Sequence, residues 1–179
     1  MCYRTLLLCS ILLLGIFPSG WKTLAQDCMN LNLYAMKVAT CCHLESFIRA
    51  DTYDECSKTM DEKYPDKKLQ KIVCSFDCMY REMGVLTGVD EIDVEKINAN
   101  QAGYDDAYQE AIAKAASACV AQKGTIREEA EMIQTECSLF ATKFHACMSL
   151  ETMKNCPAER WDSSVLCEKV REGVMPCPP

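Results

Sequence analysis

The sequence contains little glycine and no stretch in which polar and apolar residues alternate. Only 7 of its 179 residues are glycine. A strand that buries one face needs such alternation, because successive side chains point to opposite faces of a sheet. The absence of this pattern argues against a β fold and predicts helices throughout. Beyond residue 25 no run of 18 apolar residues occurs, so we expect no membrane insertion.

The common signatures of catalysis and metal binding are also missing. The sequence has no HExxH motif, no phosphate-binding loop and no Ser-His-Asp order. It contains two histidines, His43 and His145, so a hydrolase would need a dispersed triad built on one of them. We therefore expect no enzymatic activity, no cofactor and no metal site.

One short motif resembles that of a known enzyme family. In TCCHLES, residues 40–46, the paired cysteines and the histidine are similar to the catalytic helix of secreted phospholipases A2. That helix carries its histidine further on and an aspartate after it. Here His43 directly follows Cys42, Leu44 takes the place of the aspartate, and no glycine-rich calcium loop precedes the motif. We interpret the two cysteines as disulfide anchors, with a phospholipase-type hydrolase kept as an alternative.

The N-terminus predicts secretion. A nearly unbroken apolar run of 12 residues ends at Phe17, which is too short to span a membrane and typical of a signal-peptide core. Small residues precede a predicted cleavage site after Ala25, and a cut after Gly20 is the alternative. We expect residues 1–25 to be a signal peptide and residues 26–179 to form one extracellular domain.

The mature chain is acidic. Removal of Arg4 and Lys22 with the leader takes the formal charge from −7 to −9. An acidic surface repels phosphate groups. We therefore expect neither nucleic acid nor an anionic membrane surface as a partner.

Cysteine is the most informative residue type. The sequence has 14 cysteines, of which Cys2 and Cys9 lie in the leader. An even number in a secreted chain predicts a disulfide framework, here of up to six bridges. The twelve cysteines expected to form it are Cys28, Cys41, Cys42, Cys56, Cys74, Cys78, Cys119, Cys137, Cys147, Cys156, Cys167 and Cys177.

Apolar residues recur at intervals of three and four, which predicts an all-α domain of six to eight helices. The expected helices span residues 30 or 32 to 47, 52–63, 66–83, a short stretch from 93, 104–122, 126–153 with a break allowed, and 163–172. Asp66 and Ser163 are the expected N-caps of the third and last helices. Gly84 is the expected residue after the third helix, and Gly124 is expected to end the 104–122 helix. The spacing of a capping box at Thr125–Glu128 predicts the start of the next.

Cys74 and Cys78 lie four residues apart on the expected third helix. Thiol redox motifs usually place two residues between their cysteines, whereas three stand here. Side chains four apart are neighbours on a helix surface, but a direct bond between them would strain the helix. We interpret them as structural cysteines that each bond to a different part of the chain.

The spacings between cysteines carry the strongest resemblance. From Cys56 to Cys156, successive cysteines are separated by 17, 3, 40, 17, 9 and 8 residues, and Pro157 follows at once. Ten residues then lead to Cys167. This pattern resembles the Plus-C class of insect odorant-binding proteins, which is distinguished by extra cysteines and a proline directly after one of them. The stretch CSFDCMYREMGVLTG, residues 74–88, also resembles the third helix and following turn of the wider family.

The resemblance implies a compact, disulfide-stapled helical bundle around an enclosed apolar cavity. In the six-cysteine members the bridges run from first to third, second to fifth and fourth to sixth cysteine. Cys74, Cys78 and Cys119 match the second, third and fourth, and the extra cysteines are expected to tie down N- and C-terminal extensions. The other three positions stay open. The first cysteine of the six could be Cys41, Cys42 or Cys56. The fifth and sixth could be Cys137 and Cys147, or else Cys147 and Cys156.

The expected function is that of a secreted, non-enzymatic carrier of small hydrophobic, odorant-like molecules. The resemblance also suggests an olfactory receptor or a second copy of the chain as a partner. The alternative from another class is a cavity-free protein-binding or defence module. Helical phase and the resemblance together predict nine residues that line the cavity: Leu69, Ile72, Phe76, Met79, Met83, Ile112, Phe140, Phe144 and Met148.

Overall fold

The computed structural model describes residues 37–173, and every regular element in this range is a helix, which confirms the all-α prediction. The predicted leader, Cys28 and Cys177 lie outside the described residues. No helix in this range is long and apolar enough to cross a membrane. The elements are α3 (Ala50–Lys63), α4 (Lys68–Glu82), α5 (Val94–Ala99), α6 (Asp106–Ala121), α7 (Lys123–Glu131), α8 (Phe140–Lys154), the 3-10 helix η1 (Ala158–Arg160) and α9 (Val165–Arg171).

Side-chain caps begin three of these helices. Asp93, Asp105 and Ser164 each accept a hydrogen bond from the backbone N–H three residues later, at the starts of α5, α6 and α9. Such a bond satisfies a donor that has no partner within the helix. The expected start at Asp93 is therefore confirmed, whereas Ser164 takes the role expected of Ser163. Asp66 is not the cap of α4, which starts at Lys68 with no side-chain cap.

The long helix expected over residues 126–153 is broken, as its sequence pattern allowed. Residues 132–139 lie between α7 and α8 and form no α-helix. The prediction that Gly124 ends a helix is wrong, because Gly124 and Thr125 both lie inside α7. The Thr125–Glu128 capping box is wrong for the same reason. Gly84, by contrast, has the positive φ of +68° expected after α4.

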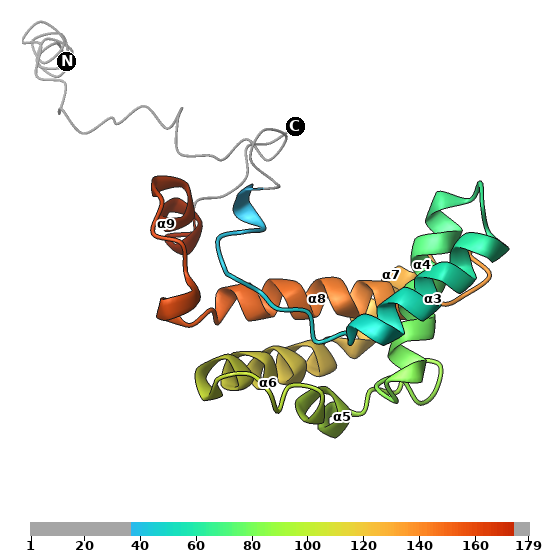
Figure 1. Cartoon of the computed structure of the whole chain (residues 1–179), viewed down its shortest axis with the longest axis horizontal. Helices are drawn as coiled ribbons and strands as arrows, with labels where there is room; N and C mark the ends of the chain where they lie inside the picture. Colours follow the sequence, from blue (N-terminus) through green and yellow to red (C-terminus); the bar gives the residue numbers. More distant parts are fainter. Residues whose placement is uncertain (1–36, 174–179) are drawn as a thin grey trace, which may run out of the picture.

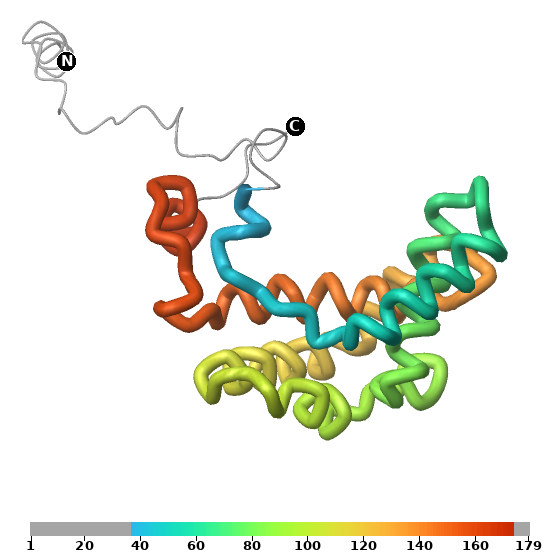
Figure 2. Tube along the Cα trace, viewed as in Figure 1, coloured from blue at the N-terminus to red at the C-terminus, as the bar shows by residue number. Residues whose placement is uncertain are grey.

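The helix expected to continue through Phe47 is also wrong. Residues 39–49 form turns and extended backbone instead. This segment runs from the neighbourhood of α9 past α8 to the start of α3 (Figure 2). Two disulfides and the hydrogen bonds of Arg160 hold the segment in this position. A local helical pattern does not encode such long-range contacts.

Helices α6 and α8 lie side by side and form the most extensive helix–helix interface of the described residues (Figure 1). Ala111, Ala115 and Ala116 of α6 are buried there, and their small side chains let the two helices approach closely. Phe144 and Met148 of α8 are buried in the same core. Helix α4 packs on α8 and on α3, α5 packs on α6, and α7 packs on α8.

Five disulfides join the described elements, and Cys74 and Cys78 reach different partners, as predicted. Each such bridge contributes about 2–4 kcal/mol by restricting the unfolded chain. Counted from Cys56, three of them run from first to third, second to fifth and fourth to sixth cysteine, the order that the family resemblance implied. The bridges are Cys56–Cys78, Cys74–Cys137, Cys119–Cys147, Cys41–Cys167 and Cys42–Cys156.

Candidate ligand-binding site

A pocket of about 230 Å³ lies between residues 44–47 and the helices α6 and α8, and it opens to the surface. Most of its wall is apolar, with a few polar groups among the apolar side chains. Its lining residues come from three separate parts of the chain. They are Leu44, Glu45, Ser46 and Phe47 from the segment, Tyr108 and Ile112 from α6, and His145, Met148, Ser149 and Thr152 from α8.

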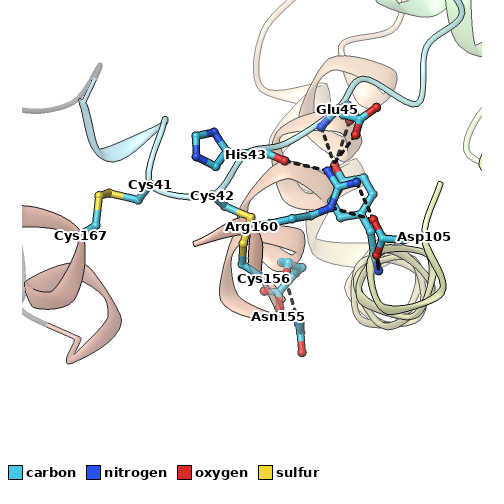
Figure 3. Close-up of a disulfide and its surroundings, with 11 residues drawn as sticks. Cys41, Cys42, His43, Glu45, Asp105, Asn155, Cys156, Arg160 and Cys167 are labelled. Atoms are coloured by element: carbon cyan, nitrogen blue, oxygen red, sulfur yellow. Dashed lines mark hydrogen bonds and ion pairs between the residues drawn. A yellow bond between two sulfur atoms is a disulfide. The ribbon is translucent and has the colours of Figure 1, made fainter. Parts of the chain in front are cut away.

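The outer wall of the pocket is held by what we call the terminal clamp, residues 41–46 together with residues 155–171. The disulfides Cys41–Cys167 and Cys42–Cys156 join its two parts (Figure 3). Two backbone hydrogen bonds add to them, from His43 N to Arg160 O at 2.9 Å and from Asp162 N to Cys41 O at 2.8 Å. The adjacent cysteines at 41 and 42 thus anchor the chain just before it forms the pocket wall.

Arg160 links the clamp to helix α6. Its guanidinium donates hydrogen bonds to Glu45 Oε1 at 2.8 Å, to the His43 carbonyl at 3.2 Å and to Asp105 Oδ2 at 2.6 Å (Figure 3). It also lies over the ring of Tyr108, 4.2 Å from the ring centroid. The hydrogen bond from Arg160 lowers the pKa of Asp105, which keeps that carboxylate charged. Only arginine combines several N–H donors in one plane with a flat face that can stack on an aromatic ring, so no other side chain could make all of these contacts together.

Tyr108 ties the pocket wall to α6 through its hydroxyl. The hydroxyl donates to the Glu45 carbonyl at 3.0 Å and accepts from the Glu45 N–H at 2.8 Å. Burial raises the pKa of Tyr108, so the hydroxyl stays protonated at neutral pH. Both hydrogen-bonding roles of this side chain are therefore taken by the protein.

An aromatic cluster adjoins the pocket and contains one imidazole, that of the lining residue His145. The ring of His145 lies 4.7 Å from that of Phe76, 5.5 Å from that of Phe47 and 6.1 Å from that of Tyr80, measured between centroids. The Tyr80 hydroxyl lies 3.2 Å from His145 Nδ1. Burial lowers the pKa of His145 from 6.5 to about 4, so the ring is neutral at neutral pH.

The nine residues predicted to line a cavity fall into three groups. Ile112 and Met148 line the pocket, and Phe76 packs against the lining residue His145 without itself lining the pocket. Leu69 and Ile72 lie on the surface, 54% and 51% exposed, and so outside the core. The remaining four are buried in the core cluster: Met79, Met83, Phe140 and Phe144.

Sequence reasoning missed the pocket residues on the 44–47 segment, because it placed them on a helix. It also missed Tyr108 as a wall residue. One signal was present: paired cysteines at 41 and 42 anchor the adjoining chain to distant parts of the protein. The sequence, however, did not show which of the other cysteines bond to Cys41 and Cys42.

A second pocket of about 400 Å³ lies under residues 132–139 and reaches Phe140. Its wall includes the ion pair of Arg127 with Asp90, at 3.1 Å, and several exposed polar residues such as Gln134 and Glu136. The apolar share of its wall is close to that of the first pocket, so the preference for the first pocket rests on the outer wall that two disulfides and Arg160 hold in place.

The described residues contain no group of three or more His, Cys, Asp or Glu side chains placed to hold a metal ion. Within residues 37–173 the side chain of His145 has one hydrogen-bond partner, Tyr80, and no carboxylate or serine hydroxyl bonds to its ring. Ser149 Oγ donates instead to the His145 backbone carbonyl.

Comparisons with protein-family models, curated proteins and solved structures find no match to this chain. The resemblance to the Plus-C class therefore rests on the cysteine spacings and on Pro157 directly after Cys156. The geometry of the pocket is an independent observation, because none of its lining residues is a cysteine.

Proposed function

We propose that this protein is a secreted carrier of small hydrophobic molecules, of the Plus-C odorant-binding type. The observation that carries the proposal is the pocket between residues 44–47 and helices α6 and α8. Its apolar floor is built from Ile112 and Met148, and its outer wall is held by two disulfides and Arg160. A wall fixed in this way reduces the ordering cost of binding.

The pocket volume limits the size of the ligand. An apolar cavity of about 150 Å³ accommodates benzene. A pocket of about 230 Å³ therefore suits a molecule somewhat larger than benzene, with roughly ten non-hydrogen atoms. Burial of apolar area would drive binding. A micromolar dissociation constant, about −8 kcal/mol, stays below the ceiling of about −1.5 kcal/mol per atom.

The disulfide arrangement supports both the type of carrier and its location. Three bridges follow the order implied for six-cysteine odorant-binding proteins, and two more join the terminal segments. Disulfides persist in oxidising compartments, which supports secretion and agrees with the predicted leader. A carrier in an extracellular fluid needs such covalent support if it is to keep a pocket open.

One observation favours a second candidate, a protein-binding or defence module. The pocket opens to the surface, whereas the resemblance implies an enclosed cavity, and the aromatic core beside it is close-packed. A protein-binding module needs no internal ligand. The same binding experiment separates the two candidates.

The test is uptake of a fluorescent naphthalene derivative by the oxidised protein, followed by displacement with small volatile compounds. We expect saturable uptake with a micromolar dissociation constant. Ile112→Trp fills the pocket and should weaken uptake at least tenfold, whereas Ile72→Trp, the same change on the exposed face of α4, should leave it unchanged. Circular dichroism and disulfide mapping check that both variants fold. Absence of saturable uptake by folded wild-type protein would overturn the proposal and favour the second candidate.

A further inference from the structure

His145 is the one imidazole among the described lining residues of the pocket. Rings of Phe47, Phe76 and Tyr80 surround it. His145 is nevertheless only partly buried, and its Nε2 is not among the buried polar atoms that lack a partner, so this nitrogen meets solvent in the open pocket. One nitrogen, Nδ1, faces the Tyr80 hydroxyl at 3.2 Å.

The surroundings of Tyr80 decide which nitrogen carries the proton. Tyr80 is fully buried, and among residues 37–173 its hydroxyl has no other hydrogen-bond partner than His145. If Nδ1 carried the proton, the tyrosine proton would be buried without an acceptor, which costs about 1–3 kcal/mol. The favoured arrangement has Tyr80 donating to Nδ1. The proton of the neutral ring then sits on Nε2.

Nε2–H is a donor without a partner among the described residues, on a side chain that lines the pocket. The two nitrogens of an imidazole point in widely different directions, so Nε2 points away from Tyr80. The other polar groups of the wall are mostly engaged. Tyr108 bonds to Glu45, Ser46 to Ile48, and Ser149 to the His145 backbone.

We propose that the pocket selects small apolar molecules that carry a single oxygen acceptor, such as a ketone, aldehyde or ester, and that Nε2–H of His145 donates to this oxygen. The inference rests on the proposed function, because it names the ligand class of the same pocket. Phe47, Ile112 and Met148 of the pocket wall would cover the apolar body of the ligand, and the hydrogen bond would set its orientation.

Thr152 is the competing group. Its hydroxyl lines the pocket seven residues further along α8, with Met148 between it and His145. Among the described residues no hydrogen bond to its hydroxyl is found, so it too could meet a ligand oxygen. Replacement by valine removes the hydroxyl and keeps the shape of the side chain, which makes Thr152→Val the matched control.

The experiment compares acetophenone with α-methylstyrene, in which a CH₂ group replaces the carbonyl oxygen at nearly constant shape. Dissociation constants of both are measured by displacement or calorimetry for wild type, His145→Phe and Thr152→Val. The measured quantity is the ratio of the two constants, because the ligands differ in their own hydration. His145→Phe should shift this ratio against the ketone by about five- to tenfold, the worth of one hydrogen bond. Thr152→Val should leave the ratio within about twofold.

Nitrogen NMR of wild-type protein provides a second readout that does not depend on a variant folding. At neutral pH His145 should show the Nε2–H tautomer, and its Nε2–H resonance should move with acetophenone but not with α-methylstyrene. A protonated Nδ1, or an unmoved resonance under saturating ketone, would overturn the inference.

The outcomes separate this inference from the proposed function. If both ligands bind and His145→Phe leaves the ratio unchanged, or if Thr152→Val shifts it instead, the selection by His145 is wrong while the carrier function stands. If neither ligand binds to folded wild type, the function proposed for this pocket is itself contradicted.

Discussion

The helical core and the terminal clamp of this protein are stabilised by different interactions. Helix α6 alone buries six residues against its neighbours, whereas η1 buries none and α9 only Cys167. The clamp instead relies on two disulfides and on the contacts of Arg160. The comparison indicates that extensive apolar burial, together with three disulfides, stabilises the bundle, whereas the pocket wall buries little and depends mainly on its disulfides and ionic contacts.

The largest expected loss of stability comes from a substitution in the helical core. Phe144→Ala removes a fully buried ring of α8 that packs against Tyr80 of α4 and should lower the free energy of unfolding by about 3–5 kcal/mol. The matched change on the clamp, Val165→Ala at a side chain that is 78% exposed, should cost less than about 0.5 kcal/mol. Chemical denaturation of the oxidised proteins measures both. Similar losses at the two sites would contradict the contrast between core and clamp.

The next largest loss of stability is expected when a disulfide of the terminal clamp is removed. The double substitution Cys42→Ala with Cys156→Ala removes a bridge that closes a long loop and should cost about 2–4 kcal/mol. Amide hydrogen exchange should then rise at residues 41–46 and 155–171, while α6 and α8 remain protected. Uptake of the naphthalene probe should fall, because the outer wall loses its anchor. Equal loss of protection in α6 and α8 would show that the two regions unfold as one unit.

A smaller effect depends on pH. Burial lowers the pKa of His145 to about 4, against about 6.5 in the unfolded chain. Between these values the unfolded state binds a proton that the folded state does not, so stability decreases as pH falls from 6.5 to 4. The loss should amount to at most about 3 kcal/mol and be nearly complete below pH 4.

His145→Gln lacks the titrating ring and is the control for this slope. The difference in unfolding free energy between wild type and His145→Gln should change over the pH 4–6.5 window and be flat above it. A difference that stays constant across the window would mean that His145 is not held neutral by burial.

Much of the fold followed from sequence patterns because it depends on local interactions. The helix α3 and the short helix after Asp93 lie where apolar spacing and capping placed them. A break in the 126–153 helix was allowed, but its position at 132–139 did not follow from the pattern, because Ile133 and Cys137 continue the apolar spacing of the neighbouring helices. A bridge from Cys137 to Cys74 holds that stretch, and no local pattern encodes a partner 63 residues away.

The candidate site was harder to predict, for two physical reasons. Helical phase put Leu69 and Ile72 on the inner face of α4, but its burial begins at Val73, and Tyr80 is the fully buried ring. The other wall belongs to an irregular segment, whose position depends on long-range disulfides and on Arg160. Ile112 and Met148 were found because they lie on long helices with regular apolar faces.

The most direct test of the carrier function is methyl NMR of the methionines during a ligand titration. Met148 lines the pocket, Met79 is buried in the core away from its wall, and Met132 is 76% exposed on the surface. With acetophenone as ligand, the Met148 methyl resonance should shift saturably with a micromolar midpoint, and that of Met132 should not move. Saturable shifts at Met132 with an unmoved Met148, or no saturable shift at any methionine, would contradict the proposed function.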